Sequence, residues 1–237
     1  MQYSNKHLVE VNCGFHFPKE TTQWDSTFFG RFYEKIINRG FTEKEERKGF
    51  QLVFGMQRNR PMVQQPEVED QVIFKNKEGM AILMGKNRVS FHVTQNYTVW
   101  NNFVDNFIKP YSEIYKTLGL GNGERGCNLV YLNRFNKSSS EPLSEYFKLV
   151  TPLDKSLGTE TNTVIHRVID NGSNLLISKF QAQLGSNAFN INFECGAQNK
   201  DTFAMNNPSW IEQANKTHGP VNDFFESLIT EKLRKEL

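Results

Sequence analysis

Apolar and polar residues alternate near the start of the chain. From Val9 to Phe17 the odd-numbered positions are apolar and the even-numbered positions are polar or small. A period of two places successive side chains on opposite faces of a β-strand, so one face of this strand should be buried. We therefore expect a strand over residues 8–17, LVEVNCGFHF, with the Cys13 side chain in the core.

The spacing changes to that of a helix in residues 24–40. The apolar residues recur three or four positions apart, at Trp24, Phe28, Phe29, Phe32, Tyr33, Ile36 and Ile37. This predicts a helix that packs on the core, with Gly40 as its C-terminal stop. Four short apolar runs separated by turn-like sequences then predict an antiparallel meander, at residues 50–56, 71–75, 81–85 and 89–95.

A longer helical pattern follows in residues 98–118. Its apolar residues line one side, and Pro110 falls in its interior. Proline removes a backbone N–H and clashes with the preceding turn, so we expect a kink near Pro110.

The order of elements then begins again. Residues 126–135 have a strand pattern and residues 141–150 a short helix pattern; strand patterns at 163–170, 175–183 and 188–195 precede a C-terminal helix. The segment FFESLI, residues 224–229, also matches FVDNFI, residues 103–108, in polarity. The predicted fold class is α+β, with two repeats of strand, helix, antiparallel meander and long helix, at residues 1–119 and 120–237. We expect one integrated domain with a curved antiparallel sheet and helices packed on one face.

Between the predicted repeats, Gly121, Gly123 and Gly126 have the G-x-G-x-x-G spacing of dinucleotide-binding loops. Such a loop needs a strand before its first glycine and a helix after its last, because the helix N-terminus supplies amides to the phosphates. Here the pattern predicts a helix before the glycines and a strand after them. We therefore interpret this segment as a flexible turn and expect no cofactor.

Composition and charge restrict the partners and the cellular compartment that we expect for this chain. Lys and Arg total 28, Asp and Glu total 26, and the two signs are mixed along the chain, so no overall field attracts nucleic acid or a membrane. Cys13, Cys127 and Cys195 form no C-x-x-C pair, which favours reduced thiols in the cytoplasm over a disulfide or zinc framework. Without a signal-peptide pattern or an apolar run of about 20 residues, we expect neither secretion nor membrane insertion.

Catalytic and metal-binding motifs are not evident. The histidines show no H-E-x-x-H or H-x-H spacing, and Cys13 and His16 lie three residues apart on a strand and so face opposite sides. We therefore predict no metal site. No G-x-S-x-G, P-loop or kinase signature occurs. A hydrolase or nuclease whose catalytic residues meet only in space remains an alternative, because such residues need not be neighbours in sequence.

Polar residues gather on one face of the predicted strands, and basic residues occupy the turns beside them. Amides and hydroxyls can recognise polar groups of another molecule without strong charge, although a solvated outer sheet face would show the same pattern. The candidate binding residues are Asn12, His16, Arg58, Arg60, Lys86, Arg88, His92, Arg134, Asn190 and Asn192.

The chain also resembles a sporadically distributed, functionally uncharacterised family of prokaryotic proteins. The residues that carry the resemblance are Trp24; Tyr97, Trp100 and Phe103; Tyr131, Leu132 and Asn133; and His218, Phe224 and Phe225. The family has a basic residue before the central tyrosine, where this chain has Val130, and Arg134 follows Asn133 instead. The patchy distribution of the family implies an accessory role such as anti-phage defence or toxin–antitoxin control.

Two architectures are compatible with the repeated order of elements. It is similar to that of the TATA-binding protein, and a helix-grip fold around an apolar cavity is the competing picture. Our leading hypothesis is a non-catalytic binding or sensing protein that recognises a protein or nucleic acid through its polar sheet face. The alternative is a carrier of a lipid-like molecule, suggested by the 20 phenylalanines, although aromatic residues usually fill a packed core.

Overall fold

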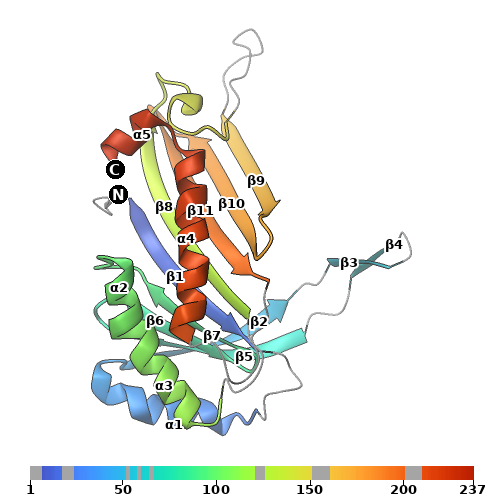
Figure 1. The fold of residues 1–237 in the computed structure, drawn as a ribbon, viewed down its shortest axis with the longest axis vertical. Helices are drawn as coiled ribbons and strands as arrows, with labels where there is room; N and C mark the ends of the chain where they lie inside the picture. Colours follow the sequence, from blue (N-terminus) through green and yellow to red (C-terminus); the bar gives the residue numbers. More distant parts are fainter. Residues whose placement is uncertain are drawn as a thin grey trace.

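The computed structural model describes residues 7–17, 24–51, 54–57, 60–63, 67–120, 126–150, 161–200 and 210–237. The fold is α+β, with a nine-stranded antiparallel sheet and several helices (Figure 1). The strands of this sheet are β1 Leu8–His16, β2 Glu43–Gln51, β5 Glu67–Lys75, β6 Met80–Gly85, β7 Arg88–Val93, β8 Gly126–Ser138, β9 Asn162–Asp170, β10 Asn174–Leu184 and β11 Ala188–Asn199.

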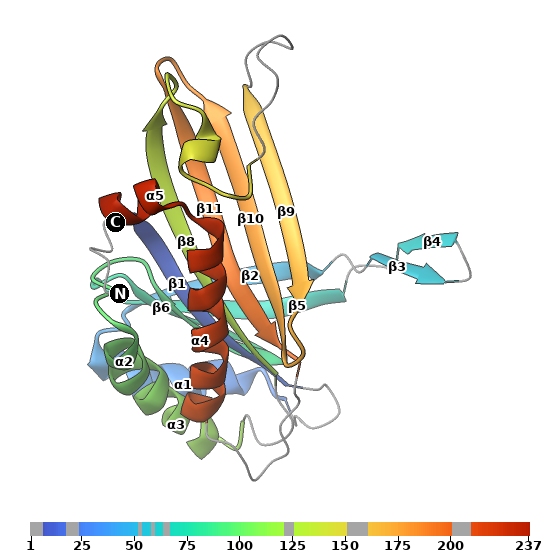
Figure 2. The same cartoon turned by 45° about the horizontal axis from the view of Figure 1, so that its top comes forward.

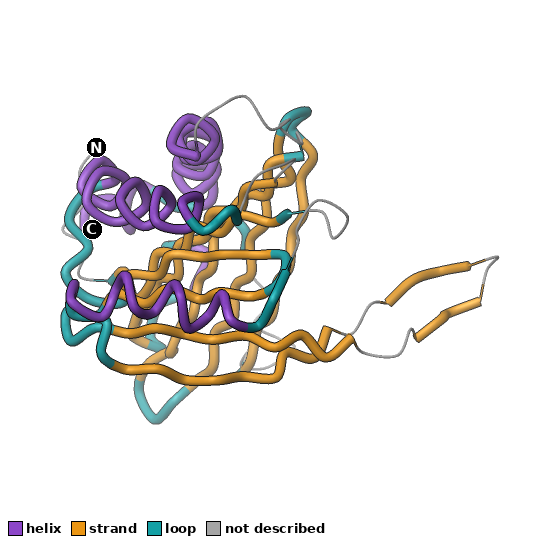
Figure 3. The backbone as a smooth tube through the Cα atoms, turned by 90° about the horizontal axis from the view of Figure 1, so that it is seen from below, coloured by secondary structure: helices purple, strands orange, loops and turns teal. Residues whose placement is uncertain are grey.

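The helical segments alternate with groups of strands. They are α1 Thr27–Ile36, η2 Ile37–Arg39, α2 Trp100–Phe103, η3 Val104–Ile108, α3 Lys109–Thr117, η4 Leu143–Glu145, α4 Trp210–Leu228 and α5 Glu231–Glu236. Two further strands, β3 Phe54–Gln57 and β4 Arg60–Val63, pair with each other and stand apart from the main sheet (Figure 3). Among the described helices, none is both long and apolar enough to cross a bilayer.

The strand order is β2-β5-β6-β7-β1-β8-β11-β10-β9. The two central strands come from opposite halves of the chain and pair antiparallel, with Val11 opposite Tyr131 and Phe15 opposite Cys127. On the two sides of this pair, β7, β6 and β5 follow β1, and β11, β10 and β9 follow β8. The sheet twists so strongly that β2 and β5 run nearly across β9 and β10 (Figure 2), as accumulated strand twist produces.

One face of the sheet carries the aromatic core. The Trp210 ring of α4 lies 4.6 Å from that of Phe15, the Phe107 ring of η3 lies 5.5 Å from that of Phe91, and Phe147 lies 4.9 Å from Phe180. The strand residues in these contacts share one face by the register of the ladder, so the helices pack on that face. We call it the helix face, and we call the other side of the sheet the opposite face.

Most of the elements predicted from periodicity are confirmed. Residues 8–16 form β1 with Cys13 fully buried, and α1 with η2 ends at Gly40, whose φ of +91° suits a helix C-cap. A helix precedes the glycine stretch and a strand begins at Gly126, whereas Gly121 and Gly123 lie outside the described residues. All three cysteines are buried free thiols.

Three details differ from the prediction. The strand β2 begins at Glu43, inside the charged run EKEERK, where no apolar alternation marks it. The long helix contains a π-helical turn at Val104–Ile108 just before Pro110, which re-pairs the backbone where proline cannot donate. The helix expected at residues 141–150 is only the short 3-10 turn η4, because the backbone that follows it bonds to the end of α4, with Phe147 bridged to Ile229 and Lys148 N donating to the Leu228 carbonyl oxygen.

Candidate functional site

A pocket of about 550 Å³ lies between α4, the start of α2 and the central strands. Its lining comes from several distant parts of the chain. These residues are His7, Leu8, Tyr97, Thr98, Val99, Trp100, Tyr131, Asn133, Cys195, His218, Val221, Asn222, Asp223, Phe225, Glu226 and Leu237. The volume falls within the range of about 300–1,000 Å³ that is usual for small-molecule sites.

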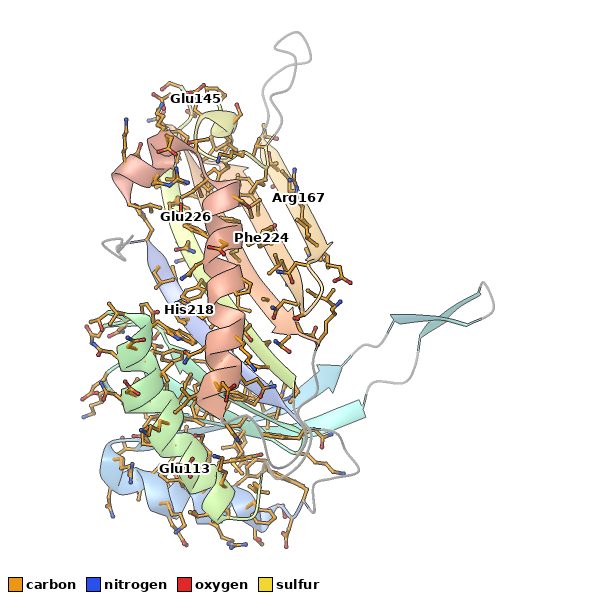
Figure 4. All side chains as sticks on the ribbon, viewed as in Figure 1. Glu113, Glu145, Arg167, His218, Phe224 and Glu226 are labelled. Atoms are coloured by element: carbon orange, nitrogen blue, oxygen red, sulfur yellow. The ribbon has the colours of Figure 1, made fainter. Side chains whose placement is uncertain are left out.

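His218 is the centre of the pocket's polar network. It projects from α4 on the side of the helix that faces α2 (Figure 4), and its ring stacks on Trp100 with centroids 4.2 Å apart and planes 8° from parallel. Its Nδ1 lies 2.9 Å from the Tyr131 hydroxyl, and its Nε2 lies 3.1 Å from Asn222 Nδ2. Trp100 Nε1 in turn donates to Asn215 Oδ1 at 2.6 Å, so both stacked rings are anchored to α4.

Burial keeps this network neutral. Desolvation lowers the pKa of His218 to about 4, so the imidazole is uncharged near pH 7. With the Asn222 amide nitrogen facing Nε2, the neutral ring carries its proton on Nδ1 and donates it to the Tyr131 oxygen. Desolvation, aided by the neighbouring Tyr97, raises the pKa of Tyr131 well above its usual value, so this hydroxyl also stays neutral.

Asn133 presents its side-chain amide to the pocket. The residue is only 8% exposed and lies on the helix face of β8. None of the described residues forms a hydrogen bond with its side chain. The amide is open to the pocket, where it offers two donors and an acceptor oxygen. Asn133 is therefore well placed to form hydrogen bonds with a ligand in the pocket.

Two further side chains of the lining, Cys195 and Glu226, could act as a nucleophile or a base, but their surroundings restrain both. Cys195 is buried, its Sγ lies 3.9 Å from the Val221 carbonyl oxygen, and burial raises the pKa of its thiol to about 12. It is therefore protonated and a poor nucleophile. At the rim, Glu226 accepts a hydrogen bond from Arg234 Nε at 2.8 Å. Among the described residues, no group of three or more His, Cys, Asp or Glu could hold a metal ion.

The binding residues expected from the sequence lie elsewhere, chiefly on the opposite face. The register places Asn12 opposite His92 and His16 opposite Arg88 across the β1–β7 pair. On the β8–β11 pair, Arg134 is opposite Asn192, and Asn190 is opposite Asn136. Lys86 follows β6 in the turn to β7. Arg60 begins β4, outside the nine-stranded sheet, and Arg58 lies outside the described residues.

Many of these side chains are bound to one another across the strands. His16 Nε2 lies 2.7 Å from Asn128 Oδ1, Arg134 Nε donates to Asn192 Oδ1 at 3.2 Å, and Asn136 Nδ2 donates to Asn190 Oδ1 at 3.2 Å. The structure thus brings Asn12, His16, Arg88 and His92 together on the β1–β7 pair and Arg134, Asn190 and Asn192 together on the β8–β11 pair, whereas Lys86 and Arg60 lie apart from both groups. Part of their hydrogen-bonding capacity is used within the sheet.

The pocket itself was not predicted as a site, although its residues were singled out for another reason. Six residues that carry the family resemblance line it, namely Tyr97, Trp100, Tyr131, Asn133, His218 and Phe225. They come from three segments more than 25 residues apart, so no spacing rule could have joined them. A polar residue at an inward position of a strand, as Asn133 is, was the available signal.

No family model, no curated protein and no solved structure matches the chain. The functional argument therefore rests on the geometry of the pocket and of the sheet.

Proposed function

We propose that the protein binds a small planar molecule with hydrogen-bonding edges in the pocket between α4 and the sheet. The observation that carries this proposal is the amide of Asn133, an inward-facing residue that is 8% exposed; the amide is open to a pocket of about 550 Å³ and has no hydrogen bond with a described residue. Buried polar groups are almost always satisfied by protein, water or ligand. A ligand in the pocket can therefore pair with the donors and the acceptor of this amide.

The lining also indicates the class of ligand. Tyr97, Tyr131 and Phe225 provide aromatic surface, and the stacked pair of Trp100 and His218 adds a rigid wall. The amide of Asn133 matches a ring edge that carries a donor beside an acceptor, as cyclic amides and nucleobases do. Because the His218 network is neutral near pH 7, the pocket favours an uncharged ring over a strong anion.

A lipid-like ligand fits this pocket less well. An alkyl chain packed against Tyr131, Asn133 and His218 would cover polar groups without offering them hydrogen bonds, which is costly. The many phenylalanines instead fill the core, where Phe15, Phe91, Phe135, Phe180 and Phe193 are fully or almost fully buried. The geometry therefore favours a polar planar ligand over a lipid.

The proposal is tested by thermal shift with defined probes. Uracil, thymine, cytosine, adenine, guanine and nicotinamide are added separately to the wild type and to Asn133→Leu. Asn190→Leu is the matched control, because it removes an amide from the opposite face. We expect at least one probe to raise the Tm of the wild type and of Asn190→Leu but not that of Asn133→Leu. Equal shifts in all three proteins, or none, would refute the proposal.

A second candidate function, recognition of a protein through the opposite face, is favoured by the edge strand β9. Val164 and Val168 share this face and are 68% and 55% exposed, which is unusual for paired valines on one strand. The neighbouring cations are engaged, since Arg134 donates to Asn192 and Lys179 lies 3.4 Å from Glu194. We therefore expect no binding of generic single- or double-stranded DNA or RNA at low salt. Salt-sensitive binding that Arg134→Ala weakens would restore a nucleic-acid partner.

We also infer that the two halves of the chain are repeats. The support is the mirrored strand order on the two sides of the β1–β8 pair, together with the matching polarity of residues 103–108, which are helical, and 224–229, which are helical up to Leu228. In this view the protein is a sensor built from two fused units. An anti-phage or toxin–antitoxin setting remains an expectation from the family resemblance.

A further inference from the structure

Three side chains on the opposite face form a continuous hydrogen-bonded chain. Ser90 Oγ lies 2.7 Å from His92 Nε2, and Nδ1 of the same ring lies 2.7 Å from Glu10 Oε1. The connectivity is hydroxyl to one imidazole nitrogen and carboxylate to the other, which is the arrangement of a serine nucleophile, its base and the group that orients the base. These residues lie across the sheet from the pocket and are independent of its ligand.

Local structure explains why the three residues meet. Ser90 and His92 are two positions apart on β7, so their side chains share a face. Glu10 comes from β1, where the register is irregular between Leu8 and Glu10. Glu10 lies two positions before Asn12, the direct partner of His92, so its side chain shares this face and reaches His92 diagonally across the β1–β7 pair. The His92 and Glu10 side chains are only 19% and 31% exposed, which shields their contact from water.

A donor for a developing oxyanion is placed beside this group by Gly14. Gly14 lies opposite Ser90 on one side and opposite Asn128 on the other. A Cβ at Gly14 would lie 2.4 Å from Asn128 Oδ1, so the absence of a side chain leaves room for the Asn128 amide over Gly14, the residue that faces Ser90. His16 Nε2 lies 2.7 Å from that Oδ1, which leaves Asn128 Nδ2 as the end of the amide that can donate to a substrate.

We propose that Ser90, His92 and Glu10 form a second, catalytic site that hydrolyses esters of short carboxylic acids. Ser90 Oγ attacks the ester carbonyl carbon while its proton passes to His92 Nε2. The bond from that carbon to the alcohol oxygen breaks, and the alcohol leaves with the proton from His92. Water then attacks the acyl group on Ser90 with His92 as base, which releases the carboxylic acid and restores the serine hydroxyl.

The surroundings define the substrate class. Ser90 is 9% exposed, so only a small acyl group can reach its hydroxyl. Strand β7 is paired on both sides, with β1 and with β6, so its backbone N–H groups are committed to the sheet and stabilisation of the oxyanion falls to side chains. Esters with good leaving groups therefore react, whereas amides, which need stronger stabilisation, do not.

The decisive experiment is labelling by a small ethoxy fluorophosphonate, with the modified residue located by mass spectrometry. Ser90 Oγ forms a bond to phosphorus, fluoride leaves, and His92 takes the proton. We expect a single modified serine, Ser90, and a labelling rate about 100-fold lower in His92→Ala, since a positioned base typically contributes that much. Ser138→Ala is the matched control, because the hydroxyl of this exposed serine is hydrogen-bonded to Ser140 Oγ and Ser140 N and contacts no histidine among the described residues, so its loss should leave labelling unchanged.

Glu10 acts through His92 as a positioning residue and is tested separately. Glu10→Gln should slow both the labelling of Ser90 and the hydrolysis of p-nitrophenyl acetate, and Glu10→Asp, which keeps the carboxylate, should recover part of the rate. Far-UV circular dichroism and Tm establish that each variant is folded. Because the label is located in the wild type, the result does not depend on any variant folding. Modification of other serines only, no modification, or an unchanged rate in a folded His92→Ala would overturn the proposal.

Discussion

At the scale of single residues, Asn133 is a polar side chain at a position where the pattern of the strand calls for an apolar one. Asn133 occupies an inward position of β8, two residues after Tyr131 and two before Phe135, where the neighbouring inward positions are aromatic. A residue that lowers stability at such a position is typical of a functional site. Its role can therefore be separated from folding by measurement.

Replacement of Asn133 by leucine should not destabilise the protein. Leucine has a similar volume and removes an amide without a partner among the described residues, so we expect the free energy of unfolding to stay equal or to rise by about 1 kcal/mol. Urea denaturation measures it. Leu129→Ala, at a fully buried position of the same strand, should lose about 3 kcal/mol and shows that the assay responds. A loss above about 1 kcal/mol in Asn133→Leu would mean that the amide supports the fold.

His218 should make the protein less stable in mild acid. Its pKa is lowered to about 4 in the folded protein, from an ordinary value near 6.5. Between these values the unfolded chain binds a proton that the folded chain does not, so stability falls as the pH falls from about 6.5 toward 4. Because the ring is only partly buried, we expect this loss to be about 1–2 kcal/mol.

The comparison of wild type with His218→Gln isolates that effect. Glutamine keeps a polar side chain beside Tyr131 but does not titrate, so urea denaturation at pH 7 and pH 4.5 should show a smaller difference for the variant. The same difference in both proteins would assign the acid sensitivity to other groups.

At the scale of elements, the junction of β8 with β11 depends on close backbone approach. Gly196 faces Val130 across this pair, and a Cβ at Gly196 would lie 2.6 Å from the Leu129 carbonyl oxygen and 2.9 Å from Val130 Cγ2. Backbone on both strands must move to admit even one methyl group. The second group of strands is thus fixed to the centre of the sheet at this point.

Two glycine-to-alanine changes should therefore have opposite signs. Gly196→Ala should cost about 2 kcal/mol because overpacking displaces backbone. Gly30→Ala, in the exposed part of α1 with no atom within 4 Å of the added Cβ, should stabilise the protein by about 0.5–1 kcal/mol. Thermal or urea unfolding of both variants compares them directly. A stable Gly196→Ala would show that the two strands are not held at this spacing.

The elements that could be predicted are those with one dry face. Strands β1, β8, β10 and β11 alternate because the helix face buries every second residue, as in the run Ile191, Phe193, Cys195. The strand β2 could not be predicted, because it is an edge strand and its charged residues pair with each other, Glu45 with Arg47 and with Lys75. A period of two arises because one face of a strand is buried, so a strand that is exposed on both faces shows no such pattern and cannot be recognised by it.

At the scale of the whole molecule, both halves of the chain share one core. Trp210, at the start of α4 in the second half, contacts Phe15, Phe17 and Tyr115 of the first half. The central strands β1 and β8 also pair along most of their length. We therefore expect unfolding in a single transition, with far-UV circular dichroism and tryptophan fluorescence changing together. Two separated transitions would indicate that the halves fold independently.

The site could not be read from the sequence for a related reason. The pocket forms where the start of α2, the middle of β8 and α4 meet, so Trp100, Asn133 and His218 are brought together by the tertiary fold and not by their positions in the sequence. The expected sheet-face residues are close in register and easier to group, since alternation alone assigns them to one side. The residues of the pocket thus depend on tertiary contacts, whereas the residues that share the opposite face of the sheet can be predicted from the local alternation.

The most direct test of ligand binding is calorimetric titration of the probe that gives the largest thermal shift into the wild type and into Asn133→Leu. If the Asn133 amide pairs with the ring edge, the variant should bind at least about tenfold more weakly, the loss expected when a buried hydrogen bond of about 1.4 kcal/mol is removed. Equal affinity for the two proteins would contradict the account.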